Sequence, residues 1–348
     1  MKDEAYSNIS LYYKLNNPLY YHKLGICISP EEDVYIDGWI GAALRNNFLF
    51  AAEEIDIMPT ISLRHLINHL PIKEKHPLYK ELKGGFPKGY SISLLSHQSN
   101  IFSTHLKKGE KLHFALLLYG HFSEYYNFFI EAIQKMCKRG FGKPMIQFNL
   151  VSVSEWDKNN STFPVYRKPS KKIQPLAHPI YLSDFINCKY TAEETDLSIQ
   201  YEVPINTYNT IRNKQGEGLS DRQHEFPGFY PLVRAAANRV TKLMSLYIYP
   251  NDLDYYQKMK DNLPSFLQYA VTPVLSSAQL NRINISSTAK EGSPDRIQFF
   301  GYTGELKYNG HFNYYLPLLL FAQDIGVGNH ATYGIGNYKI INPNKNNI

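Results

Sequence analysis

The sequence predicts an α+β protein built from two tandem ferredoxin-like domains. The length of 348 residues exceeds what one hydrophobic core usually organises. Each half also offers the same order of elements, strand, helix, two strands, helix and strand. We expect domains over residues 1–156 and 191–348. A connection over 157–190 would join them, because its first part is rich in Pro, Asn, Ser and Lys and lacks hydrophobic periodicity.

The elements of the first half follow from the spacing of its apolar residues. Apolar positions three or four residues apart predict helices within 38–55 and 121–140, and Gly140 is a typical helix stop. Alternating or β-rich runs predict the strands, at 23–29, 90–95, 111–120 and 142–156.

The second half repeats this order without repeating the sequence. Helices are expected at 231–247, where one stripe is apolar, and in the short segment 314–326. Strands are expected at 196–204, 296–308 and 337–341.

Composition narrows the class of protein. The net charge of +6 and the pI of about 8.9 favour a polyanionic partner only modestly. The three cysteines share no CxxC spacing, so we expect neither a disulfide scaffold nor a metal site. No run of 18 uncharged apolar residues and no signal-like N-terminus is present, which predicts a cytoplasmic protein without a membrane span.

The strongest functional signal is the glycine-rich segment GVGNHATYGIGNY at 326–338. Its glycines permit a positive φ and a close approach of the backbone to a phosphate. A plain glycine-rich turn explains the pattern equally well. No Gly-Lys-Ser/Thr follows and no strand leads directly into the segment, so a P-loop and a dinucleotide fingerprint are excluded. We expect RNA contacts at Gly326, Gly328, His330, Gly334 and Gly336.

Several segments resemble one family, the CRISPR-associated repeat-processing endoribonucleases of the Cas-six type, within the RAMP superfamily. The most specific is FFGYTGELKYNGHFNYYLPLLLFAQDIGVGNHATYGIGNYKI, which ends in the glycine-rich segment. DGWIGAALRNN resembles the first helix of the family, and LLLYGHFSEYYNFFIEAIQKMCKRGFGKPMIQFNLVSV its later strand, helix and strand. VPINTY resembles the start of the second domain.

The resemblance implies a function as well as a fold. Such a protein would bind CRISPR repeat RNA and cut it without metal or cofactor, by attack of a ribose 2′-OH that leaves a 2′,3′-cyclic phosphate. The product crRNA would be retained, and other CRISPR effector subunits are possible partners. The alternative is a catalytically inactive RAMP subunit that binds crRNA within an effector complex. The fold alone does not decide between the two.

Cleavage of this kind requires a base, an acid and a cation. Members of the family often carry a catalytic histidine shortly after the first helix. His65 and His69 are the candidates, because their spacing places both on one helical face. Arg45 and Lys73 are candidate cations. An exposed face that carries two histidines is more often simply surface, and the HPLY segment just beyond departs from the family pattern.

Basic residues outside these motifs could form an electrostatic track for the RNA backbone. Phosphate contacts of this kind supply affinity rather than sequence choice. The candidate residues are Arg167, Lys168, Lys171, Lys172, Arg234 and Arg239. Each of them alone could equally be a solvated surface charge.

Overall fold

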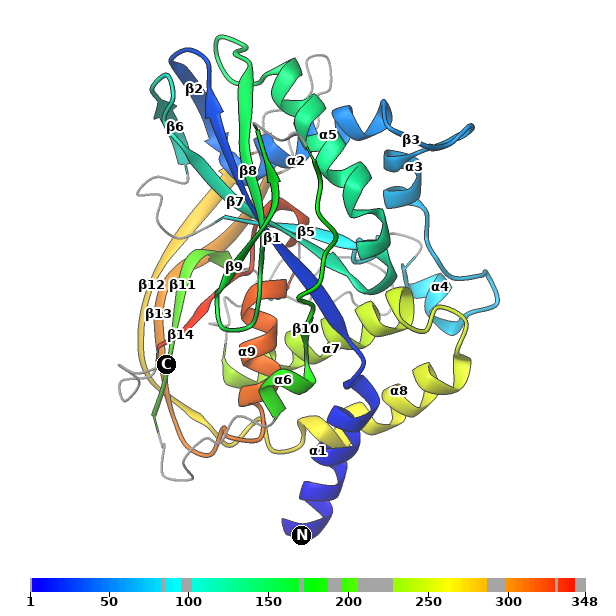
Figure 1. Ribbon diagram of the computed structural model, residues 1–348. Coiled ribbons are helices and arrows are strands. Elements are labelled where there is room, and N and C mark those ends of the chain that lie inside the picture. Colours follow the sequence, from blue (N-terminus) through cyan, green and yellow to red (C-terminus); the bar gives the residue numbers. More distant parts are fainter. Residues whose placement is uncertain are drawn as a thin grey trace.

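Strand β1 (Tyr20–Pro30) is the centre of an antiparallel sheet in the first half of the chain. The strand order is β5-β7-β1-β8-β9, with β5 at Tyr90–Leu94, β7 at Leu112–Tyr119, β8 at Phe148–Trp156 and β9 at Thr162–Arg167. Helices α2 (Ile40–Glu53) and α5 (Tyr126–Arg139) pack against each other on one face of this sheet, at the upper right of Figure 1. The computed structural model describes residues 2–82, 85–94, 102–168, 172–186, 196–205, 228–286, 298–328 and 331–341.

The second half forms a four-stranded antiparallel sheet with the same connectivity. Its order is β12-β13-β11-β14, and the strands are β11 (Asp196–Ile205), β12 (Val274–Ser286), β13 (Gln298–Asn309) and β14 (Lys339–Ile341). The helices of the unit are α7 (Phe229–Tyr247) and α9 (Leu316–Ile325), and α8 (Leu253–Leu267) is an addition. In both sheets the first strand lies between the third and the fourth, which is the ferredoxin-like arrangement. The expected fold class is confirmed.

Short elements complete the described chain. They are β2 (Val34–Trp39), β3 (Asp56–Met58), β4 (Ile61–Ser62), β6 (Phe102–Leu106), β10 (Ile180–Tyr181), α3 (Leu63–Asn68), α4 (Pro77–Leu82), α6 (Ser183–Ile186) and the 3-10 turns η1 (Gly120–Tyr125) and η2 (Ala331–Tyr333). No helix of the described ranges is long and apolar enough to cross a bilayer.

The N-terminal helix α1 (Lys2–Asn16) packs with the second half rather than with the first. The ring of Tyr12 stacks on that of Phe266 in α8, with centroids 3.8 Å apart. The Tyr12 hydroxyl donates to the carbonyl of Ala237 in α7 at 3.2 Å. Figure 1 shows α1 beside α8, at the bottom of the view. The division at residue 156 therefore does not follow the packing, because the chain starts on the second unit before it enters β1.

The expected connection over 157–190 also differs from what the structure shows. Residues Thr162–Arg167 form β9, which pairs with β8, and β10 pairs with the start of β1. The backbone N–H of Gln174 donates to the Val165 carbonyl at 2.8 Å. Two stretches of this polar segment, β9 and β10, therefore extend the first sheet.

Helix α9 joins the two halves through a buried polar contact. Its Asp324 accepts hydrogen bonds from the Tyr21 hydroxyl at 2.7 Å and from Lys23 Nζ at 2.8 Å, and both donors lie on β1. The Lys23 side chain is only 11% exposed. A buried ammonium requires a partner, since the loss of its hydration is otherwise uncompensated.

This contact yields a stability prediction. Asp324→Ala leaves the Lys23 charge buried and unpaired, so the free energy of unfolding should fall by about 3 kcal/mol. Asp37→Ala is the matched control, because it breaks an exposed pair with Lys143 of 3.0 Å and should cost less than about 1 kcal/mol. Urea unfolding of both variants measures the difference. Equal losses would show that Asp324 does not hold the halves together.

Candidate functional site

The glycine-rich segment folds back on itself after α9. Four of its glycines, Gly326, Gly328, Gly334 and Gly336, have a positive φ between 72° and 89°. The N–H groups of three of them donate within the protein, Gly326 to Ala322, Gly334 to Ala331 and Gly336 to Pro204. These three N–H groups therefore already have partners within the protein, and the RNA contacts expected at Gly326, Gly334 and Gly336 stay a prediction. Gly328 is half-exposed, and the adjoining His330 lies outside the described residues.

The same segment docks onto the first half of the chain through Tyr333. The indole Nε1 of Trp39 donates to the Tyr333 carbonyl. A Cβ at Gly41 would collide with this carbonyl oxygen, so only glycine lets α2 approach so closely. Gly334 lies against the Ile92 carbonyl of β5, where an added Cβ would be 3.3 Å from the oxygen. The glycine-rich segment is thus a contact between the two halves.

This docking brings together two features that the sequence predicted separately. The Arg45 guanidinium of α2 lies over the ring of Tyr333, 4.2 Å from its centroid. Its Nη1 donates to Asn46 Oδ1 at 3.3 Å, whereas its buried Nε has no hydrogen-bond partner within the described residues. Arg45, a candidate cation of the first half, therefore contacts the glycine-rich segment directly.

Two further polar side chains lie close to Arg45, and sequence reasoning did not single them out. Lys88 is half-buried, and Tyr90 at the start of β5 is 1% exposed. Burial, together with the charge of Arg45, lowers the pKa of Lys88 to about 8. In the sequence only the spacing of Lys88 and Tyr90 could have indicated that they act together, because residues two apart in an extended segment face the same side.

The expected catalytic histidines lie on a different part of the first half. His65 is on α3, whose N-terminus is capped by the Ser62 hydroxyl, and His69 ends this helix. The two rings are nearly parallel, with centroids 6.2 Å apart, and both side chains are exposed. Lys73 is exposed in the turn that follows. The histidines are close enough to act on one phosphodiester, and both are open to solvent.

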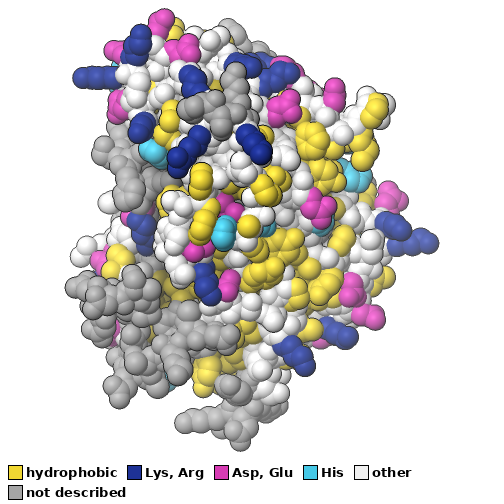
Figure 2. Space-filling view, in the orientation of Figure 1, with side chains coloured by type: hydrophobic (Ala, Val, Ile, Leu, Met, Phe, Trp, Pro, Cys, Tyr) yellow, Lys and Arg dark blue, Asp and Glu magenta, His cyan; other side chains and the backbone are white. Residues whose placement is uncertain are grey.

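The basic track is only partly on the surface. Arg167, Lys168, Lys172 and Arg234 are exposed, and Lys171 lies outside the described residues. Arg239 is a correction, because it is 9% exposed and donates through Nε to the Ile325 carbonyl at 3.0 Å. It therefore binds the C-terminal end of α9 inside the protein. On the face in Figure 2, Lys and Arg side chains are densest in the upper part of the view and are mixed with acidic ones.

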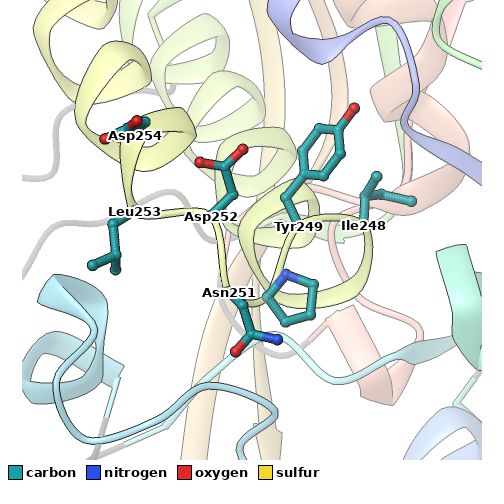
Figure 3. A pocket seen from close by; sticks show the side chains of 7 residues that line it. Ile248, Tyr249, Asn251, Asp252, Leu253 and Asp254 are labelled. Atoms are coloured by element: carbon teal, nitrogen blue, oxygen red, sulfur yellow. The ribbon is translucent and has the colours of Figure 1, made fainter.

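An open hollow at the turn between α7 and α8 does not fit RNA. Residues 248–254 line it, and Figure 3 shows Asp252 and Asp254 among them. Asp252 caps α8 by accepting from the N–H of Tyr255 at 2.8 Å. No cation lines the hollow, and its carboxylates would repel phosphate. Within the described residues no group of three or more His, Cys, Asp or Glu side chains is placed to hold a metal ion.

Two models of known protein families match parts of this chain. The family model of the CRISPR-associated endoribonuclease Cas6 matches residues 207–338, and a second model, described as an N-terminal domain, matches 63–178. No curated protein gives a significant match.

Two solved structures share the fold. A Cas6 product complex aligns with 92% of this chain and 99% of its own, at 12% identity and a TM-score of 0.51. A partial Cas6-RT-Cas1–Cas2 complex aligns with 95% of this chain at 15% identity and a TM-score of 0.50, and the alignment covers 48% of that longer chain. At these identities the structural likeness shows the fold alone.

The internal packing of the glycine-rich segment can be tested by adding a methyl group. Gly336→Ala should lower the free energy of unfolding by about 3 kcal/mol, because the Cβ requires a strained φ of 89° and meets the Val327 carbonyl oxygen. Gly109→Ala is the control, since its φ of 76° is similar but nothing lies within 4 Å of the new Cβ. This control should cost about 1 kcal/mol. Chemical unfolding that gives equal losses would rule out the close contact.

Proposed function

The family match and the fold support a Cas6-type CRISPR-associated protein, and on this basis we propose that the chain is an endoribonuclease that cuts CRISPR repeat RNA. The ribose 2′-OH attacks the adjacent phosphate, the 5′-oxygen leaves, and a 2′,3′-cyclic phosphate remains. This reaction needs no metal ion. The chain then retains the crRNA product.

The family match over 207–338 is the observation that carries this proposal. The matched region contains the glycine-rich segment, and that segment is docked where β2 ends and α2 begins, through Trp39 and Tyr333. RNA held near Gly328 would therefore lie close to cations of the first half. The exposed Arg167, Lys168, Lys172 and Arg234 would add contacts to its phosphates at other points.

The chemistry requires proton transfer at two oxygens. A base must take the proton of the 2′-OH, and an acid must protonate the leaving 5′-oxygen. We assign these roles to His65 and His69, because imidazole titrates near neutral pH and the two rings lie 6.2 Å apart. A cation, Arg45 or Lys73, would stabilise the charge of the phosphorane.

A second function is favoured by the exposure of both histidines. Within the described residues neither exposed imidazole has a buried hydrogen-bond partner that would orient it, as strong acid–base catalysis usually requires. In this alternative the chain is a RAMP-type subunit that binds crRNA without cutting it. Both functions allow other CRISPR proteins as partners, and one protein of the same fold is part of a Cas6-RT-Cas1–Cas2 complex.

The first test concerns the metal and the nucleophile. Repeat RNA should be cut at an unchanged rate in excess EDTA, because no step uses a metal ion. A single 2′-deoxy nucleotide at the scissile position should abolish cleavage, since the attacking oxygen is missing, while binding continues. The measurement is gel analysis of end-labelled RNA under single-turnover conditions. Tight binding without any cleavage would favour the inactive subunit.

The second test concerns the histidines. His65→Ala or His69→Ala should lower the single-turnover rate about a hundredfold, which is the usual contribution of one acid or base. RNA affinity should change little. The exposed His311 provides a control, because His311→Ala removes an imidazole from the second half of the chain. Full activity of the double variant would exclude His65 and His69 as the acid and the base. The endoribonuclease proposal would then depend on the first test alone.

A further inference from the structure

Lys88 and Arg45 are two neighbouring cations, and no carboxylate of the described residues forms an ion pair with either. The Lys88 ammonium lies over the ring of Phe86, 3.7 Å from its centroid. Ring contacts of this kind recover only a small part of the hydration that a half-buried ammonium loses. The two cations therefore repel each other in the free protein.

A buried hydroxyl group without a partner completes this cluster. Tyr90 is 1% exposed, and its hydroxyl has no hydrogen-bond partner within the described residues. Burial raises the pKa of this phenol to about 12, so the hydroxyl keeps its proton and can donate it in a hydrogen bond. The buried Nε of Arg45 is a second donor without a partner. Native proteins leave few such groups unsatisfied, and each one requires an explanation.

The position of the cluster narrows the choice of ligand. Arg45 comes from α2, Tyr90 from β5, and the ring of Tyr333 from the glycine-rich segment packs beneath Arg45. The Tyr247 hydroxyl of α7 donates to the Pro87 carbonyl at 2.7 Å and so holds the segment that carries Lys88. The cluster therefore lies where both halves of the chain meet. Two cations and a hydroxyl donor complement a phosphate, which offers a negative charge and several acceptor oxygens.

We propose that Arg45, Lys88 and Tyr90 form a binding site for one phosphate of the RNA backbone, where α2, β5 and the glycine-rich segment meet. This inference rests on the proposed function, because it takes RNA as the ligand. A bound phosphate removes the repulsion between the two cations and gives the orphan hydroxyl an acceptor. The site lies on the first half but is complete only when the glycine-rich segment of the second half is docked.

Binding measurements with variants test the site. Lys88→Ala should weaken the affinity for repeat RNA about tenfold. The plot of log K against log salt concentration should become less steep, by about 1 in slope, because one phosphate contact is lost. Lys135→Ala is the matched control, since Lys135 is an exposed lysine paired with Glu54 at 2.9 Å. The control should leave both the affinity and the slope unchanged. The same affinity and slope for Lys88→Ala would overturn the proposal.

Tyr90→Phe separates binding from folding. This variant keeps the ring that packs near Phe48 and Phe129 and removes only the hydroxyl. Its melting temperature should not fall, because the hydroxyl lacks a partner in the free protein. RNA affinity should nevertheless drop several-fold. An unchanged affinity would exclude Tyr90 from the site, whereas a large loss of stability would show that the hydroxyl has a structural partner.

Amine labelling of the unaltered protein gives a second readout. At about pH 7.5 an amine with a pKa of about 8 is neutral roughly a hundred times more often than an ordinary lysine, so an acylating reagent should modify Lys88 early. Saturating repeat RNA should protect Lys88 and leave Lys135 unaffected, as read by mass spectrometry. If RNA binds but does not protect Lys88, the site is wrong. If repeat RNA does not bind at all, the proposed function itself fails.

Discussion

The arrangement of the whole molecule depends on how its last segment is docked between the two halves. The Tyr333 carbonyl accepts from the Trp39 indole, and only glycine at position 41 leaves room for that carbonyl beside α2. On the other side, Gly336 donates to Pro204 at the end of β11. One short stretch is therefore fixed to α2 and to the second sheet at the same time. Because Arg45 stacks on the Tyr333 ring, its position depends directly on this docking.

The same interface explains why part of the charge of the chain is not available to a ligand. Lys23 is paired with Asp324, and Arg239 donates to the last carbonyl of α9. A cation at the C-terminal end of a helix is favoured by the helix dipole and satisfies a carbonyl that has no partner within the helix. Lys23 and Arg239 both bind α9, which is buried between the halves. The Lys23–Asp324 pair is neutral as a whole, so of these two residues only the buried Arg239 takes a net positive charge away from the surface that RNA could meet.

The sequence predicts the order of the elements well because hydrophobic periodicity is local, and both four-strand cores follow from it. The sequence does not predict those elements whose position depends on contacts between residues far apart in the chain. Helix α1 is held by contacts such as Tyr12 on Phe266, more than 250 positions away in the chain. Strand β9 contains Pro164 and lies in a segment rich in Pro, Asn, Ser and Lys, and it forms because β8 offers an open edge. At the site, positive φ at the glycines was predictable. The carbonyls that occupy their N–H groups were not, because one of them, Pro204, comes from a distant strand.

The proposed function requires an account of how the glycine-rich segment could serve RNA binding when the N–H groups of three of its four glycines are occupied. Its glycines allow a tight turn, and the turn presents one side chain, that of Tyr333, to the first half of the chain. Tyr333 in turn supports Arg45, whose Nε remains without a partner within the described residues. A guanidinium held in place before a ligand arrives loses little conformational entropy on binding. In the proposed function the glycines would contribute to binding by positioning Arg45, and this guanidinium would supply a phosphate contact.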